Sequence, residues 1–142
     1  MAALGANTAR LITPTGKAGS TALLGVKASS TIYQGSALGD SSGAARALVA
    51  QDAFMGFALE SATGGGSDGL VKVRACLEGY LTQSAITGFS GGVDDIGAAV
   101  YMSSDNDLTA TSTNNTQIGK IFNYDATNGY TVFFQAVALR SI

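Results

Sequence analysis

Histidine and tryptophan are absent from this 142-residue sequence, which also has a single cysteine, Cys76, and a single proline, Pro14. Histidine is the commonest general base and the commonest metal ligand in proteins. Its absence therefore excludes Ser-His-Asp and Cys-His catalytic sites, and ordinary zinc sites as well. One cysteine cannot build an internal disulfide framework, and it is typical of a protein made in a reducing compartment.

Charged side chains are also scarce. They make up 13% of the sequence, which is about half of the ~25% found in an average globular protein. The eight lysines and arginines are scattered, and the net charge is −2, so no basic stripe indicates nucleic-acid binding. With so little charge, the surface is expected to consist of small polar residues, glycine and alanine, or to be partly covered by partners.

Long hydrophobic runs are missing, although 46% of the residues are hydrophobic. No apolar run approaches the ~18 residues that a membrane-spanning helix needs. The first residues do not place a basic segment before an apolar stretch, so no secretory signal is expected. The sequence therefore predicts a soluble domain that does not enter a membrane.

What is present is a pattern typical of antiparallel β-structure. Short apolar runs alternate with clusters of glycine, serine, asparagine and aspartate, and no long stretch has the 3.6-residue apolar period of a helix. The clearest predicted strand is Leu70–Leu81, because its residues alternate between an apolar face and a polar face. The expected apolar face carries Val71, Val73, Ala75, Leu77, Gly79 and Leu81, and the expected polar face carries Lys72, Arg74, Cys76, Glu78 and Tyr80.

A hairpin is predicted at the C-terminal end. Ile118–Tyr124 leads into a turn at 125–129 that contains Asn-Gly, the strongest short hairpin signal, and Tyr130–Leu139 returns. Both faces of the returning strand are apolar, which is typical of a central strand or of a strand with one face against another subunit. In the second case Phe133, Val137 and Leu139 would form the interface.

These elements predict an all-β fold: a single-domain β-sandwich or barrel, jelly-roll-like, with about eight short and mostly antiparallel strands over residues 19–142. Residues 1–18 lack alternation, and we expect an extended N-terminal arm that is either a frayed end or a strap over a neighbouring subunit. A short helix at 81–86 or 44–50 is an alternative to a strand there. The remaining strand candidates are 22–27, 31–38, 44–49, 54–61, 96–102 and 108–112.

Three short motifs match known functional patterns, but each lacks the other residues or the structural element that the function requires. Gly64–Gly69 fits G-x-G-x-x-G, but a strand follows it where nucleotide binding needs a helix N-terminus, so a flexible hairpin loop is expected. Asp105 and Asp107 could begin a calcium loop, but its sixth and twelfth positions are Ala110 and Thr116 instead of glycine and glutamate. The tripeptide at 104–106 lacks the S-x-x-K and K-T-G motifs of penicillin-recognising enzymes. This segment is predicted to be a polar turn that keeps a hairpin tip soluble.

The remaining chemical groups do not form a recognisable site. Cys76 is expected to be a passive, semi-buried thiol, even though Lys72 or Arg74 could supply a cationic neighbour. The two glutamates, Glu60 and Glu78, and the eight aspartates do not single out a carboxylate pair for glycoside hydrolysis. We therefore predict no catalytic, cofactor-binding or metal-binding residues, no cofactor, and no small-molecule substrate.

The order of the segments carries a resemblance. A Y-x-G strand comes first, then D-x-F-x-G-x-A, then V-x-V-R with a later glycine, then D-I-G-x-x-V-Y, a short acidic turn and I-G-x-I. The residues are Tyr33, Gly35, Asp52, Phe54, Gly56, Ala58, Val71, Val73, Arg74, Gly79, Asp95, Ile96, Gly97, Val100, Tyr101, Ile118, Gly119 and Ile121. Over roughly residues 30–139 this order resembles the small decoration or cement proteins of tailed-bacteriophage heads.

The resemblance implies a structural virion protein and not an enzyme. Such a protein would lie on the outer surface of the phage head, bind the major capsid protein and clamp neighbouring subunits, after synthesis in the cytoplasm of the bacterial host. It would also bind itself, as a homodimer or a homotrimer. Two alternatives stay open: a carbohydrate- or receptor-binding β-domain of a phage tail or head fibre, which the lack of tryptophan disfavours, and an aspartate-based hydrolase.

Overall fold

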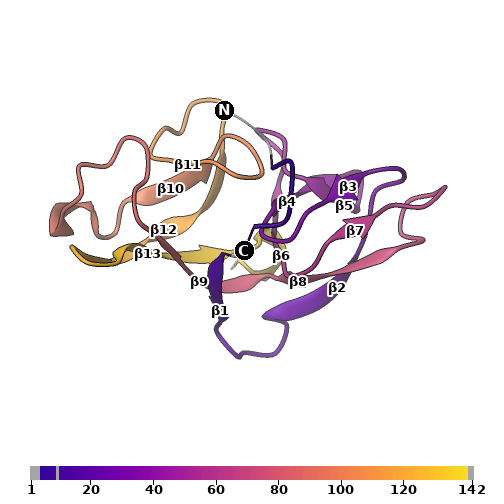
Figure 1. The fold of residues 1–142 in the computed structure, drawn as a ribbon, viewed down its shortest axis with the longest axis horizontal. Helices are drawn as coiled ribbons and strands as arrows, with labels where there is room; N and C mark the ends of the chain where they lie inside the picture. Colours follow the sequence, from indigo (N-terminus) through magenta and orange to yellow (C-terminus); the bar gives the residue numbers. More distant parts are fainter. Residues whose placement is uncertain (1–3, 9, 141–142) are drawn as a thin grey trace.

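Strands dominate the fold in this computed structural model, which describes residues 4–8 and 10–140 (Figure 1). The predicted all-β class with antiparallel sheets is confirmed. The described residues form thirteen strands instead of about eight, because several expected strands are divided into shorter ones. Where a short helix was the alternative to a strand, the structure has strands: β5 occupies 44–47 and β9 extends to Gln83.

The larger sheet has six strands in the order β1-β9-β13-β12-β10-β11. Their bounds are β1 Leu11–Pro14, β9 Glu78–Gln83, β13 Gly129–Gln135, β12 Thr116–Asp125, β10 Ala99–Met102 and β11 Leu108–Thr109. Every pairing in this sheet is antiparallel. A short 3-10 helix, η1 (Val93–Asp95), lies in the connection before β10.

The smaller sheet has five strands in the order β2-β8-β6-β4-β5. Their bounds are β2 Thr21–Gly25, β8 Lys72–Cys76, β6 Phe54–Ala58, β4 Ala37–Ser41 and β5 Ala44–Ala47, and a separate pair is formed by β3 Thr31–Ile32 and β7 Ala62–Thr63. A parallel bridge between Val26 and Ala45 brings the two outer strands together, so this sheet curls towards closure. Apart from β1, the two main sheets divide by sequence, with strands before β9 in the smaller sheet and β9 to β13 in the larger one, and the arrangement is consistent with the predicted β-sandwich.

The predicted strand Leu70–Leu81 is broken, and this expectation was wrong in detail. Residues 72–76 form β8 in the smaller sheet, and residues 78–83 form β9 in the larger one. The break is at Leu77, whose N–H donates to the carbonyl of Ser20 instead of to a strand neighbour (2.7 Å). Because the chain passes from one sheet to the other there, Cys76 is covered on both sides and fully buried instead of semi-buried.

The C-terminal hairpin is confirmed as β12 and β13. Its returning strand ends at Gln135, however, and Val137–Leu139 forms a second 3-10 helix, η2, where a strand was expected. On one side Gln135 pairs with Glu78, the first residue of β9, so β9 offers no partner beyond it. On the other side the guanidinium of Arg140 donates to the carbonyls of Gln135 and Gln117. Val137 is exposed, while Leu139 packs against a core cluster.

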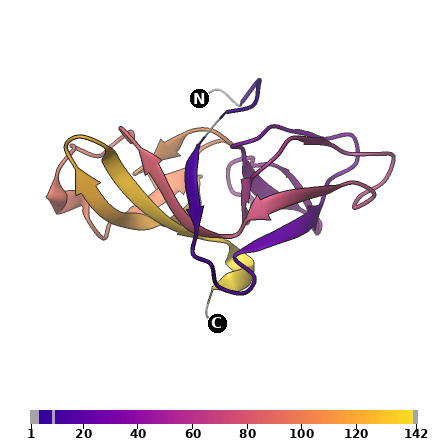
Figure 2. The ribbon, with the colours of Figure 1, turned by 60° about the horizontal axis from the view of Figure 1, so that its bottom comes forward.

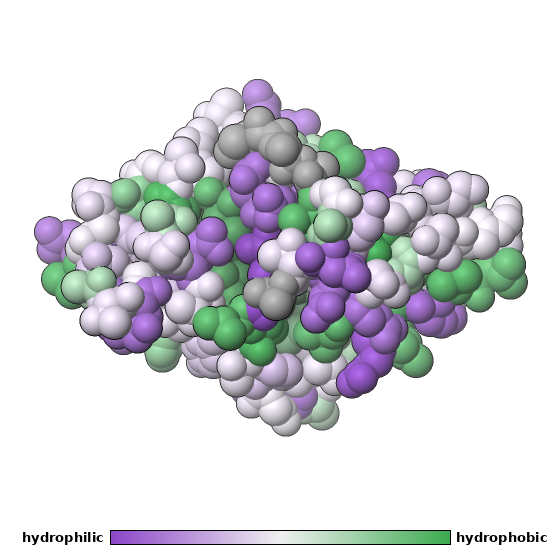
Figure 3. Space-filling model, in the orientation of Figure 1, coloured by the Kyte–Doolittle hydropathy of each residue, from purple (hydrophilic) through white to green (hydrophobic). Residues whose placement is uncertain are grey.

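Aromatic rings from both sheets pack against one another. Phe54 and Phe57 of β6 meet Phe134 of β13 edge to face, with ring centroids 4.8–6.1 Å apart. These rings belong to a buried cluster that also includes Leu81, Val100, Met102, Ile118 and Val132 from the larger sheet. Both halves of the chain therefore contribute to this cluster, while a second buried cluster that includes Val26, Leu38 and Val73 lies mainly within the smaller sheet. On the face shown in Figure 3, by contrast, hydrophobic residues occur in small groups among polar ones.

Part of the expected N-terminal arm is a sheet strand. Leu11–Pro14 pairs with β9 along its whole length, from Leu11 opposite Thr82 to Pro14 opposite Gly79. Figure 2 shows β1 crossing in front of the junction between the two halves of the molecule. Residues 1–3 and 9 of the arm, and 141–142 at the other end, lie outside the described residues.

Candidate interaction surface

One row of side chains crosses the outer face of the larger sheet. Thr13 is paired with Tyr80, Tyr80 with Phe133, and Phe133 with Lys120. Paired residues in antiparallel strands point to the same side of the sheet. The next row, Leu81, Val132 and Ile121, points into the core and is almost completely buried. Alternation along the strands therefore directs Tyr80, Phe133 and Lys120 outwards.

A β-bulge adds a third aromatic ring to this row. The pairing between β12 and β13 shifts between Ile121 and Asn123, so Phe122 has no opposite residue. Bulges commonly redirect a side chain in this way. The ring of Phe122 lies 4.9 Å from that of Tyr80, which in turn lies 5.5 Å from that of Phe133. Although it is a large hydrophobic residue, Phe122 is 54% exposed.

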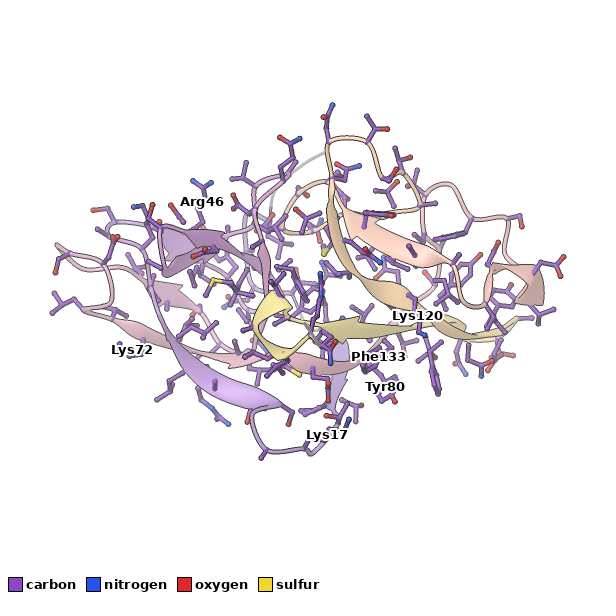
Figure 4. The ribbon with its side chains drawn as sticks, turned by 180° about the vertical axis from the view of Figure 1, so that it is seen from behind. Lys17, Arg46, Lys72, Tyr80, Lys120 and Phe133 are labelled. Atoms are coloured by element: carbon purple, nitrogen blue, oxygen red, sulfur yellow. The ribbon has the colours of Figure 1, made fainter. Side chains whose placement is uncertain are left out.

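We call Tyr80, Phe122 and Phe133, with the flanking Thr15, Lys17 and Lys120, the aromatic surface. These six residues line a shallow hollow of about 480 Å³. In Figure 4, Lys17, Tyr80, Phe133 and Lys120 lie together on one half of the molecule, whereas Arg46 and Lys72 lie on the other half. The aromatic surface thus combines apolar rings with positive charge at its edge.

Glu78 fixes the N-terminal side of the aromatic surface. Its carboxylate is buried and accepts hydrogen bonds from the hydroxyl of Thr15 and the side-chain amide of Gln135, each at 2.7 Å. The ammonium of Lys17 is 3.9 Å away and remains mostly exposed. Together, the bonds from Thr15 and Gln135 and the nearby charge of Lys17 lower the pKa of Glu78. This network holds residues 15–17 against the sheet beside Tyr80.

The predicted polar turn at 103–107 is a turn, but it is not an exposed tip. Asp107 donates to the hydroxyl of Ser104 through its N–H, as turn chemistry requires. Asp105 is 1% exposed, contrary to the expectation that its charge keeps the tip soluble. Its carboxylate accepts hydrogen bonds from the N–H of Leu4 (3.0 Å) and the hydroxyl of Ser36 (2.9 Å). The N-terminal segment covers this turn, which sequence alternation could not indicate.

Arg10 also binds the turn at 103–107. Its guanidinium donates to the carbonyl of Gly35 (2.6 Å) and to both oxygens of Asn106 (2.8 and 2.9 Å), and it lies over the ring of Phe57. Burial lowers the pKa of Arg10. The buried polar groups around Arg10 and Asp105 therefore bind one another and attach the N-terminal segment to the sheets.

The other residues considered from the sequence lie apart from one another. Burial raises the pKa of Cys76 to about 11, so its thiol stays protonated at neutral pH. Glu60 accepts a hydrogen bond from the backbone N–H of Arg74. The Gly64–Gly69 loop is bonded to residues 26–30 through its backbone and Asp68. Within residues 4–8 and 10–140, no group of three or more acidic or cysteine side chains could hold a metal ion.

Sequence patterns had selected only part of the aromatic surface. The apolar second face of the returning strand pointed to Phe133, whereas Tyr80 was assigned to a polar face and Phe122, Lys17 and Lys120 were not singled out. No helix in the described part of the chain is long and apolar enough to cross a membrane. Comparison with protein-family models, with curated proteins and with solved structures gives no match for this chain.

Proposed function

We propose that this chain is a structural protein of a tailed-phage virion, a decoration or cement protein on the outer surface of the head. It binds the major capsid protein, joins neighbouring subunits and stabilises the shell, and it associates with itself as a homodimer or a homotrimer. It acts by binding and not by catalysis. The order of strand motifs from Tyr33 to Ile121 supports this proposal, and so does the aromatic surface.

The aromatic surface is the observation that carries the proposal. Exposed aromatic residues on a rigid scaffold are typical of binding sites, because they bury a large apolar area and lose little conformational entropy. Tyr80, Phe122 and Phe133 are held by three adjacent central strands. On a shell that repeats the same subunit many times, one modest contact per copy becomes strong overall when the copies are linked.

Carbohydrate or receptor binding by a fibre domain is the second candidate, since exposed aromatic rings also bind sugars. The rings of Phe122 and Phe133 are inclined to that of Tyr80 by 62° and 53°, so the three do not form one flat platform. A glycan-binding screen distinguishes the two functions. Specific binding of a glycan that is lost in Phe122→Ala would favour the fibre domain.

The decisive experiment uses empty shells assembled from the major capsid protein of the phage that encodes this chain. The purified protein should co-sediment with the shells, occupy symmetry-related positions in electron cryomicroscopy images and raise the temperature at which the shells break. Phe122→Ala should weaken the binding, whereas Leu23→Ala, at a residue of the smaller sheet that is 64% exposed, should not. Wild-type protein that stays free of the shells would overturn the proposal.

A further inference from the structure

The edge of the aromatic surface is positively charged, and its lining contains no carboxylate. The hollow is lined by Thr15, Lys17, Tyr80, Lys120, Phe122 and Phe133. Glu78 lies beneath the surface. Its oxygens are bonded to Thr15 and Gln135, and one of them is 3.9 Å from the ammonium of Lys17, so it offsets part of that charge. The side chain of Lys17 is 76% exposed and Lys120 is exposed too. An occupant with negative charge complements this edge.

The rings of Tyr80, Phe122 and Phe133 are inclined to one another, so they form a concave apolar site, here called the cup, and not a flat stacking platform. Flat ligands such as sugar rings or successive nucleobases need aromatic faces on which they can stack. Here the rings of Phe122 and Phe133 are tilted by 62° and 53° from the ring of Tyr80. Such a cup presents both ring faces and ring edges, and it suits a three-dimensional apolar side chain that contacts several rings at once.

A partner cannot add a strand to the sheet at this place. β9 lies between β1 and β13, β13 lies between β9 and β12, and β12 lies between β13 and β10. The backbone hydrogen bonds of these three strands are therefore taken within the sheet. The occupant has to lie over the face of the sheet, where side chains, not backbone groups, bind it.

A second copy of this chain fits the aromatic surface poorly. In a two-fold interface the same patch meets itself. Lys17 and Lys120 of each copy would then be brought into one contact. None of the six lining residues carries a carboxylate, and Glu78, which lies 3.9 Å from Lys17, is buried in its own copy. Like charges placed together in an interface weaken it. Self-association is thus expected to use another part of the molecule.

We propose that the aromatic surface binds an acidic segment of a partner protein, with apolar side chains in the cup and carboxylates at Lys17 and Lys120. This inference deepens the proposed function, because it gives the chemistry of the partner segment, and it rests on that function for the identity of the partner. The segment is contacted from above the sheet by side chains of β9, β12 and β13 and by residues 15–17.

The test uses a synthetic peptide with a central leucine and phenylalanine flanked by aspartates, and a matched peptide with asparagines in place of the aspartates. Isotope-labelled protein is titrated with each while NMR shifts are recorded. The acidic peptide should shift the signals of Tyr80, Phe122 and Phe133, and about 0.5 M salt should weaken its binding. Equal binding of the asparagine peptide would overturn the inference, as would binding of oligothymidylate or an acidic oligosaccharide but not of the peptide.

Matched charge reversals locate the site. The double variant Lys17→Glu/Lys120→Glu should weaken peptide binding by about tenfold or more. The control Lys72→Glu/Arg74→Glu makes the same charge change at two exposed positions of β8 and should bind like the wild type. Equal loss in both variants would indicate a general effect of net charge and would overturn the assignment.

The same variants separate this inference from the proposed function. If shells bind the wild type and the Lys17→Glu/Lys120→Glu variant equally well, the acidic-segment inference fails and the capsid function stands. If the wild type binds the acidic peptide at the aromatic surface but never binds shells, the capsid function fails and the chemistry of the surface stands.

Discussion

Single buried polar residues attach the N-terminal segment to the two sheets. Arg10 is bonded to Asn106, and Ser36 to Asp105, although the two members of each pair are far apart in sequence. The buried carboxylate of Glu78 likewise accepts a hydrogen bond from the hydroxyl of Thr15 and holds that part of the N-terminal segment against the larger sheet. A buried polar group costs free energy when it has no partner, so each such side chain stabilises the fold only as long as its bonds are complete.

Replacing Arg10 should destabilise the protein. Arg10→Ala removes three hydrogen bonds and the contact with the ring of Phe57, and it leaves the carbonyl of Gly35 without a donor. We expect the free energy of unfolding to fall by about 1–3 kcal/mol, as measured by urea denaturation. Arg74→Ala, at an exposed position of β8, is the control. A loss below about 0.5 kcal/mol for Arg10→Ala would contradict the role assigned to this residue.

The ionised form of Glu78 should stabilise the fold in a pH-dependent way. Hydrogen bonds from Thr15 and Gln135 lower its pKa in the folded protein, so the unfolded chain binds the proton more readily. The stabilisation is therefore present above the unfolded pKa of about 4.3 and is lost as the pH falls through the lower pKa of the folded state.

The variant Glu78→Gln isolates this contribution. Urea denaturation between pH 3 and 7 should give a difference in unfolding free energy, wild type minus variant, that is largest near neutral pH and shrinks in acid. The pKa values of Asp95 and Asp125 are also lowered by hydrogen bonds, but these groups are common to both proteins and cancel. A difference that does not change with pH would show that the charge of Glu78 is not involved.

At the scale of the element, the Asn-Gly turn of the C-terminal hairpin depends on glycine. Gly129 has a φ of +85°, a conformation that other residues adopt only with strain. A Cβ atom at this position would also lie 2.6 Å from backbone atoms of Ser84, where the next strand of the sheet ends. Both effects make the position intolerant of any side chain.

Gly129→Ala should therefore lower the melting temperature, with a loss of about 1–3 kcal/mol in the free energy of unfolding. Gly92→Ala serves as the control, because the added methyl group would meet no atom within 4 Å and the backbone there is extended. Thermal denaturation followed by circular dichroism measures both. Equal melting temperatures for the two variants would show that the turn relaxes without cost.

The same hairpin shows what sequence patterns can predict. Its turn and both of its strands, except for the end of the returning one, were predicted because the signals, Asn-Gly and the apolar runs that flank it, are local. Leu70–Leu81 has clear period-two alternation, yet it divides between two sheets at Leu77, since sheet membership is decided by partners distant in sequence. The aromatic surface escaped prediction for that reason: only the register of β9, β12 and β13 brings Tyr80, Phe122 and Phe133 together.

At the scale of the whole molecule, the shared core should make the two sheets unfold together. The cluster around Phe134 contains residues from both halves of the chain, including Phe54 and Phe57 from β6 and Val132 from β13. Neither sheet can lose this contact without exposing the apolar face of the other. A single domain of this size commonly unfolds in one cooperative transition under such conditions.

Phe134→Ala tests this coupling. Removing a ring that is fully buried against Phe54 and Phe57 should cost about 3–5 kcal/mol, whereas Leu70→Ala, at a residue that is 69% exposed, should cost little. Hydrogen exchange in the variant should speed up equally in β4 of the smaller sheet and in β12 of the larger one. If β12 became labile while β4 kept its protection, the sheets would be independent units, and the aromatic surface could be studied on the larger sheet alone.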